Sequence, residues 1–362
     1  MESNSKQKVF VAMSGGVDSS VSAALLKEQG YDVTGVYMKN WSGDDFGIQG
    51  DCPWQADQDD AESVCKKLGV PFRSFNFEKE YRERVVEYFF AEYKAGRTPN
   101  PDVMCNKEIK FHLFLEKAIE EGADLIATGH YVRRTKGNGV FKLLKGVDEN
   151  KDQSYFLYNI TQEQLSKSLF PIGHLQKSEV RELAKKFDLP VADKPDSQGI
   201  CFIGEIDVQE FLRARIKPHK GDIVDIDSGK KVGEHDGVEF FTLGQREGIG
   251  VGGREEPYFV VDKDGEKNIL YVGMGKKHPK LFEDMVRIGN LHLINDSLSI
   301  EDLVGKDLSA SARYRQKPQN CILSIDGKII TAKFNEAQRA VTPGQSLVIY
   351  DGEECLGGEV II

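Results

Sequence analysis

A run of small and polar residues, Ser14-Gly-Gly-Val-Asp-Ser-Ser20, has the composition of an anion-binding loop. It follows a short apolar stretch, Lys8–Met13, and precedes helix-favouring residues, Val21–Gln29, an order that predicts strand, glycine turn and helix. Glycines let the backbone approach a ligand closely, and successive backbone N–H groups at a helix N-terminus form a nest for phosphate oxygens. Asp18 adds a carboxylate that suits Mg²⁺. The sequence therefore predicts a nucleotide phosphate site here.

This loop differs from the two commonest nucleotide motifs. It has no lysine to reach the β- and γ-phosphates, and it is not Gly-x-Gly-x-x-Gly. The Ser-Gly-Gly-x-Asp-Ser form resembles the PP-loop of the ATP pyrophosphatase superfamily, whose members split ATP between the α- and β-phosphates. The alternative is an ordinary turn between a strand and a helix.

A second candidate centre lies in the segment Gly96–Lys110. Two prolines within three residues predict a rigid, extended turn, followed at once by a helix over about residues 105–121. A cysteine at a helix N-terminus has a lowered pKa and more thiolate, which makes Cys105 a candidate nucleophile. Asp102 lies three residues upstream, within reach as an acid or base. The alternative for Cys105 is a small buried hydrophobic residue.

A third candidate is Cys201, in the Gly-rich polar loop Asp196–Gly204. Loop residues between glycines are accessible, which suits a group that must meet two partners. A structural role between Ile200 and Phe202 remains the alternative.

Composition limits the class of protein. The 362 residues suggest two or three domains, and no apolar run is long enough for a membrane span. The polar N-terminus lacks an apolar signal region, so we expect a cytoplasmic protein without a membrane partner. Six cysteines without Cys-x-x-Cys give no support for a structural metal site. The net charge of −10 means that any RNA contact must come from a local basic patch.

The first half has the pattern of an α/β doubly wound parallel sheet, which we place in residues 1–206. Ligands lie at the carboxyl ends of strands in such a sheet, where Met38, Gly129 and His130 fall. The expected strands and the long helix are Asp32–Trp41, Phe72–Phe77, Asp124–Tyr131 and Glu78–Ala95, and a short helix is expected at Ser178–Phe187.

After residue 206 the pattern changes to short apolar runs divided by Gly-rich turns, which is typical of β-structure. We expect a small central β-rich domain over 207–277 and a C-terminal β-barrel over 278–362. The central strands are predicted at Asp222–Ile226, Val238–Leu243, Tyr258–Asp262 and Ile269–Val272. Within the barrel, Arg313-Tyr314-Arg315 interleaves an aromatic ring with two cations, a pattern that suits RNA backbone contact and base stacking.

Several further motifs make a specific resemblance. With the PP-loop they are Gly96-Arg-Thr-Pro-Asn-Pro-Asp-x-x-Cys-Asn106, Ala127-Thr-Gly-His-Tyr131, Lys151-Asp-Gln-Ser-Tyr155, Phe170-Pro-Ile-Gly-His174, Ser197-Gln-Gly-Ile-Cys-Phe-Ile-Gly204 and Gly244-Gln-Arg246. In this order and spacing the chain resembles the tRNA-specific 2-thiouridylases over essentially its whole length. That family uses ATP with Mg²⁺ to replace the 2-oxygen of uridine 34 in tRNAs for Lys, Glu and Gln by sulfur.

The resemblance implies roles for the candidate residues. Cys201 would carry a persulfide taken from a sulfur-relay donor protein, a cysteine desulfurase or sulfur carrier. Cys105 would be the second catalytic cysteine, the nucleophile, and a transient Cys105–Cys201 disulfide would form. Asp102 would be the general acid/base. The residues implied to hold ATP are Ala12, Met13, Ser14, Gly15, Gly16, Val17, Asp18, Ser19, Met38 and Gly129. Those implied to meet the target base or the tRNA are Asn100, Pro101, Asp102, His130, Lys151, Asp152, Gln153, Arg313, Tyr314 and Gln345.

Two other functions remain open at this point. One is a PP-loop ligase that acts on a small molecule and needs neither cysteine. The other is a non-enzymatic RNA-binding protein with a vestigial nucleotide fold.

Overall fold

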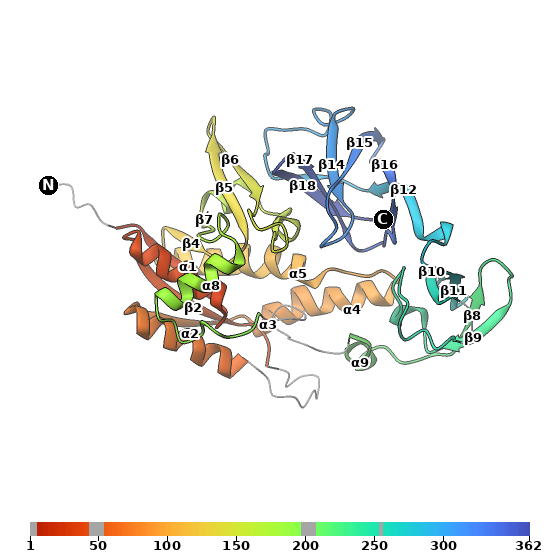
Figure 1. Cartoon of the computed structure of the whole chain (residues 1–362), viewed down its shortest axis with the longest axis horizontal. Coiled ribbons are helices and arrows are strands. Elements are labelled where there is room, and N and C mark those ends of the chain that lie inside the picture. The colour runs from red at the N-terminus through yellow and green to blue at the C-terminus, as the bar shows by residue number, and fades with distance from the viewer. Residues whose placement is uncertain (1–5, 43–53, 197–207, 253–255) are drawn as a thin grey trace.

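The computed structural model describes residues 6–42, 54–196, 208–252 and 256–362 (Figure 1). Its N-terminal part is built on a parallel sheet whose strands lie in the order β3-β2-β1-β4-β7. These strands are β1 (Lys8–Met13), β2 (Asp32–Lys39), β3 (Phe72–Asn76), β4 (Leu125–Ala127) and β7 (Ser168–Leu169). The strand expected over Asp124–Tyr131 is thus shorter, and its last residues form the loop that follows.

Helices cover both faces of this sheet, as expected for a doubly wound fold. Val9, Val11 and Met13 of β1 pack with α1 (Val17–Glu28), α2 (Trp54–Leu68) and α8 (Lys177–Lys186). Phe10 and Ala12, which alternate with them, face the other cluster. Because both faces of β1 are apolar and buried, the strand is a continuous apolar run.

Two helical runs contribute to that second cluster. The first is α3 (Glu78–Tyr81), a π-helical turn η2 (Arg82–Val86) and α4 (Glu87–Lys94). The second is α5 (Pro101–Met104), a π-helical stretch η3 (Cys105–Leu113) and α6 (Phe114–Glu120). The prediction that the second run begins at Cys105 was wrong. Pro101 opens the helix, since its fixed φ and missing N–H suit the first helical position, and the Asn100 side chain accepts a hydrogen bond from the backbone N–H of Val103.

The central part is β-rich, as predicted, with the strand order β10-β11-β8-β9. Its elements are α9 (Val208–Arg213), β8 (Gly221–Asp225), β9 (Lys231–His235), β10 (Tyr258–Asp264) and β11 (Ile269–Met274). The strand predicted at Val238–Leu243 was wrong. Gly237, at φ +135°, turns the chain into a 3₁₀ helix, η5 (Val238–Phe240), which buries Val238 and Phe240 without strand alternation.

The C-terminal part is the expected β-barrel. Its main strands run in the order β12-β16-β15-β14-β17-β18, and the bridge between Ile288 and Ile361 brings the two ends together. They are β12 (Phe282–Ile288), β13 (His292–Leu293), β14 (Asp307–Ser311), β15 (Gln319–Asp326), β16 (Ile329–Arg339), β17 (Ser346–Asp351) and β18 (Glu354–Val360), preceded by η6 (Pro279–Leu281).

A hairpin of the N-terminal half extends the barrel sheet. It consists of β5 (Val132–Gly137) and β6 (Val140–Lys145), and β6 pairs with β18 (Figure 1). The short elements η4 (Ser154–Leu157), α7 (Gln162–Ser166) and β7 follow it. Because a strand ladder joins them, the N-terminal half and the barrel are held by backbone hydrogen bonds as well as by side-chain packing.

Buried hydroxyls reinforce this junction. The Tyr155 hydroxyl donates to the Ser346 carbonyl at 2.9 Å and accepts from the Ser346 N–H at 3.2 Å. We expect Tyr155→Phe to lower the free energy of unfolding by about 1–3 kcal/mol, because buried backbone groups lose their partner. Urea unfolding of this variant beside Tyr271→Phe, at a half-buried tyrosine, measures the difference. Equal midpoints for the two variants would contradict the assignment.

Candidate active site

The PP-loop lies between β1 and α1, where the sequence predicts it. Gly16 occupies the N-cap position of α1 and has no side chain that could accept a hydrogen bond from the helix. The first N–H groups of α1 therefore point into the loop. Ser14 N–H donates to the Ser19 hydroxyl at 3.2 Å, and the Ser20 hydroxyl donates to the Gly16 carbonyl at 2.7 Å. Gly15 has φ +72°, and a Cβ there would lie 2.4 Å from the Asp57 carbonyl oxygen. The loop is therefore shaped by its own hydroxyls, and α2 lies directly against it.

Gly129 packs against this loop. A Cβ on Gly129 would lie 2.7 Å from the Ser19 backbone nitrogen. The sequence places Gly129 at the carboxyl end of a strand, and in the structure it packs on the first turn of α1. The next residue, His130, is buried, and its ring centroid lies 5.7 Å from that of Phe111 in η3. The end of β4 thus connects the PP-loop with the helix that carries Cys105.

Two lysines from distant parts of the chain reach the loop, and the sequence analysis missed both. Lys177 Nζ lies 2.7 Å from Asp18 Oδ1, and Lys194 Nζ lies 3.2 Å from the Gly15 carbonyl oxygen. Lys194 also pairs with Asp57 and Asp60 at 2.7 Å each. Burial alone would lower the pKa of Lys194, but these two hydrogen-bonded carboxylates raise it. The loop thus gains from outside its motif the cations that the motif itself lacks.

Asp18 is the PP-loop carboxylate that faces this cluster. Its Oδ1 accepts from the Tyr131 hydroxyl and from Lys177, both at 2.7 Å, and no described residue donates to Oδ2. Burial, together with the charge of Asp18, raises the pKa of Tyr131, so this hydroxyl stays a donor. Within the described part of the chain this carboxylate therefore keeps one oxygen without a donor, an arrangement that fits a hard cation such as Mg²⁺.

Asp196 joins several of these cations. Its carboxylate pairs with Lys151 at 2.6 Å and with Lys177 and Arg181 at 2.7 Å. Lys177 bridges Asp196 to Asp18. A continuous line of ion pairs therefore connects Lys151, one of the predicted tRNA contacts, with the PP-loop.

Because of the ion pairs of Asp196, we expect the free energy of unfolding to fall as the pH is lowered into the acid range. Burial alone would raise the pKa of Asp196, but hydrogen bonds from Lys151 and Lys177 lower it from 3.8 to about 2. A carboxylate with a lowered folded-state pKa stabilises the fold above its unfolded pKa, and this stabilisation is lost as the pH falls through the folded value. We expect Asp196→Asn to be less stable than the parent chain at neutral pH, and the difference to shrink toward about pH 2. Asp193→Asn, at a side chain that is 91% exposed, is the control in urea unfolding across pH. A difference that is independent of pH would contradict the assignment.

The second centre has a different local geometry from the predicted one. Cys105 is fully buried and lies five residues after the helix cap Asn100, so it is not at the helix N-terminus, and the argument for a dipole-lowered thiol pKa does not hold. Asp102 instead occupies the first turn, where its carbonyl accepts from Asn106 at 2.9 Å. Asn100, Pro101 and Asp102 therefore form the helix start, and Cys105 follows on the same helical run.

Several predicted tRNA contacts have their side chains engaged within the chain. Asp152 accepts from the Gly146 N–H at 2.9 Å, and Gln153 accepts from the Tyr131 N–H at 2.9 Å. His130 Nδ1 lies 2.8 Å from the Thr128 hydroxyl, and burial, followed by the charge of Lys110, holds the pKa of His130 well below its usual value. These three side chains thus make hydrogen bonds within the chain next to the loop, and Asp152 and Gln153 remain partly exposed.

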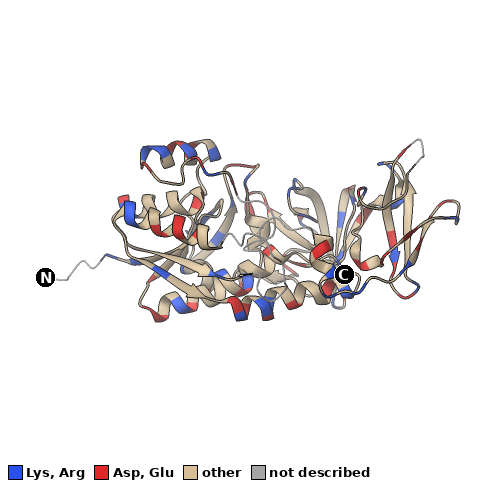
Figure 2. Cartoon of the chain, turned by 90° about the horizontal axis from the view of Figure 1, so that it is seen from below, with Lys and Arg blue, Asp and Glu red and all other residues tan. Residues whose placement is uncertain are grey.

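The barrel contributes three of the remaining predicted contacts, Arg313, Tyr314 and Gln345. Tyr314 is half-buried, with its ring 4.2 Å from that of Phe156, while Arg313 is exposed. Figure 2 shows acidic and basic residues mixed along the helices of the N-terminal half. Gln345 lies against the Thr98–Pro99 backbone, beside Asn100.

Cys201 and its neighbours in the predicted loop, residues 197–204, lie outside the described residues. Within the described ranges, no three His, Cys, Asp or Glu side chains form a group able to hold a metal ion. Among the same residues, none of the helices has the length and apolar character needed to cross a membrane.

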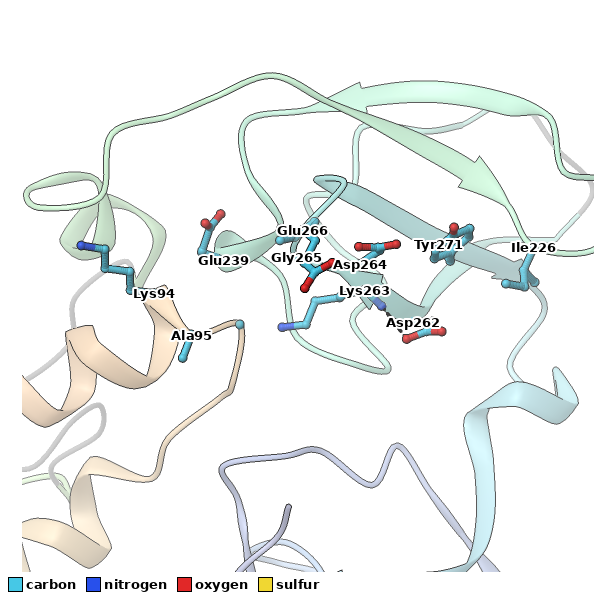
Figure 3. A pocket seen from close by; sticks show the side chains of 12 residues that line it. Lys94, Ala95, Ile226, Glu239, Asp262, Lys263, Asp264, Gly265, Glu266 and Tyr271 are labelled. Carbon is cyan, nitrogen blue, oxygen red and sulfur yellow. Dashed lines mark hydrogen bonds between the residues drawn. The ribbon is translucent and has the colours of Figure 1, made fainter.

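A cavity of about 760 Å³ lies elsewhere, between the end of α4 and the central sheet (Figure 3). It is lined by residues that include Lys94, Glu239 and Lys263. Burial lowers the pKa of Lys263 to about 8, and its ammonium donates to the Phe241 carbonyl at 2.8 Å. None of the predicted site residues lines this cavity, so the candidate active site remains the PP-loop with the start of α5.

Three domain families match consecutive parts of the chain and agree with this architecture. A tRNA methyl transferase HUP domain family matches residues 7–205, a tRNA methyl transferase PRC-barrel domain family matches 209–274, and an aminomethyltransferase beta-barrel domain family matches 284–361. A solved 4-thiouridine synthetase, bound to RNA and ATP, is 18% identical with a TM-score of 0.37, over 57% of this chain and 50% of that one.

Full-length relatives are much closer. The tRNA-specific 2-thiouridylase MnmA of Streptococcus uberis is 51% identical over 100% of this chain and 96% of its own length. The protein of the same name from Bacillus subtilis is 51% identical over 98% of this chain and 94% of its own length. With half of all positions identical from end to end, the chain belongs to the tRNA-specific 2-thiouridylase family.

Proposed function

We propose that this chain is a tRNA-uridine 2-sulfurtransferase that uses ATP and Mg²⁺ to make 2-thiouridine at position 34 of tRNAs for Lys, Glu and Gln. The observation that carries the proposal is the link made by Gly129 and His130. Gly129 touches the PP-loop, and His130 contacts the helix that begins beside Asp102 and contains Cys105. This link supports a single site in which nucleotide activation and sulfur transfer follow one another.

The chemistry explains why a PP-loop suits this reaction. Oxide is a very poor leaving group, so the uracil 2-oxygen must first be activated. We propose that this oxygen attacks the α-phosphorus of ATP and that pyrophosphate departs. The N–H groups of α1, with Lys177 and Lys194, would stabilise the charge that builds up on the phosphates. Mg²⁺ bound with ATP would supply further charge neutralisation, held at the Asp18 carboxylate.

Sulfur transfer then needs a nucleophile and a second thiol. In our proposal the terminal sulfur of a Cys201 persulfide attacks C2, and AMP leaves with the former 2-oxygen. The Cys105 thiolate next attacks the Cys201 sulfur, so the S–S bond to the base breaks, 2-thiouridine is released and a Cys105–Cys201 disulfide forms. The disulfide takes two electrons from a thiol reductant before the next cycle, and a persulfide donor protein reloads Cys201. Asp102 would move the protons as general acid/base.

The remaining assignments follow the same proposal. We place ATP against residues 12–19, Met38 and Gly129, and the target base against Asn100–Asp102, with His130 and Gln345 beside it. The tRNA would pass over Lys151–Gln153 and Arg313-Tyr314. The domains are proposed as 1–206, 207–277 and 278–362, in a cytoplasmic protein.

Product analysis tests the proposal. The chain is incubated with ATP, Mg²⁺, unmodified tRNA and a persulfide source, and mass spectrometry identifies the nucleotides and the digested nucleosides. We expect AMP, pyrophosphate and 2-thiouridine, with the thiolated nucleoside lost in Cys201→Ala. AMP without a thiolated nucleoside would favour a ligase for a small molecule, and ADP would contradict cleavage at the α-phosphate.

A further inference from the structure

A turn of the barrel, residues 342–345 between β16 and β17, holds the segment that leads into α5. The Thr98 N–H donates to the Pro343 carbonyl at 2.9 Å. The side-chain nitrogen of Gln345 donates to the Thr98 carbonyl at 3.0 Å and to the Pro99 carbonyl at 3.2 Å. Three hydrogen bonds thus join residues that lie about 250 positions apart in the sequence.

The contact is tightly fitted. Gly344 has φ +93°, and a Cβ there would lie 2.8 Å from the Thr98 carbonyl oxygen, so no larger residue fits the turn. Thr98 is 8% exposed, and its hydroxyl lies 3.3 Å from that of Thr242 in the central domain. Segments from all three parts of the chain therefore meet at Thr98.

What this contact fixes is the start of the catalytic helix. Asn100 follows Pro99 directly and caps α5, accepting from the Val103 N–H at 3.2 Å. Asp102 lies in the first turn and Cys105 begins the continuation of the same helix. Because the helix cap Asn100 follows Pro99 directly, a shift of the Thr98–Pro99 backbone would also move the start of α5.

We propose that Gln345 is a positioning residue, which acts on the reaction by holding the start of α5. A glutamine amide has two N–H donors, and here both go to backbone carbonyls. This inference rests on the proposed roles of Asp102 and Cys105 and assigns to the barrel a part in placing them.

Hydrogen exchange of the full chain without tRNA or ATP tests the inference. In Gln345→Ala, we expect the backbone amides of Thr98, Val103, Met104 and Cys105 to exchange about tenfold faster, since two hydrogen bonds that hold the segment are lost. Gln319→Ala is the matched control, because that side chain donates to the Lys317 carbonyl within the same barrel. Gln345→Met keeps much of the side-chain bulk without the donors, and serves if the alanine variant fails to fold.

Kinetics supply a readout that a general loss of stability would not give. A positioning role predicts a fall in kcat for 2-thiouridine formation with little change in KM for tRNA. Unchanged exchange at Thr98, Val103, Met104 and Cys105 together with a raised KM for tRNA would overturn the inference and make Gln345 a direct tRNA contact. Since the exchange experiment contains no substrate, it gives its answer even if the proposed sulfur transfer fails.

Discussion

Gly129→Ala is expected to lower ATP-dependent AMP formation by about 100-fold, the usual effect of moving catalytic groups by about 1 Å. The added Cβ would lie 2.7 Å from the Ser19 nitrogen and 2.9 Å from the Asp18 carbonyl carbon. Both are backbone atoms of the first turn of α1, which cannot rotate away as a side chain can. The PP-loop must therefore move, and with it the N–H groups that face the phosphates.

The control for this variant is Gly137→Ala on the nearby hairpin strand β5. No atom lies within 4 Å of a Cβ at Gly137, so the same chemical change should leave the rate unaltered. Rates of AMP formation in the presence of tRNA are compared for both variants. If Gly129→Ala keeps a rate within a few-fold of the parent chain, the packing of Gly129 on the loop has no catalytic importance.

Lys177→Met is the second substitution for which we expect a large effect. Lys177 Nζ lies 2.7 Å from oxygens of both Asp18 and Asp196, and the side chain is 15% exposed. Without this cation, two carboxylates are left close to the position proposed for the pyrophosphate. We expect AMP formation to fall by about 100-fold or more, the magnitude typical for loss of one charge-stabilising group at a reaction centre.

Lys185→Met on the same helix is the matched control. Its side chain is 66% exposed and pairs only loosely with Asp193, at 3.6 Å. The rate of AMP formation is measured against ATP concentration for both variants. Similar curves for Lys177→Met and Lys185→Met would show that Lys177 has no role beyond the ion pairs of the free protein.

The parts of the fold that sequence could predict are those with a local signal. The apolar run of β1, the glycines after Met13 and the helix formers after Ser20 are adjacent in sequence, and they are confirmed as a strand, turn and helix. The barrel is confirmed for the same reason, since its strands are divided by recognisable turns. Val238–Leu243 misled the prediction because a buried apolar run has the same composition in a 3₁₀ helix as in a strand.

The missed features are contacts between distant segments. Lys177 and Lys194 come more than 150 residues after the PP-loop, and nothing in their local sequence indicates which carboxylates they meet. The pairing of β6 with β18 and the contact of Gln345 with Thr98 have the same character. The start of α5 was open to prediction, however, because Asn100 followed by Pro101 is a recognised N-cap and first-turn pair.

In the proposed reaction ATP activates the 2-oxygen of the target uridine, and an isotope experiment follows that oxygen. tRNA carrying ¹⁸O at the 2-position of uridine 34 is thiolated by the chain, and the AMP is isolated and weighed by mass spectrometry. We expect one ¹⁸O atom in each AMP formed with 2-thiouridine, because the former 2-oxygen leaves on the phosphorus. AMP without the label, formed beside 2-thiouridine, would contradict adenylation of the base and would mean that ATP is cleaved for another purpose.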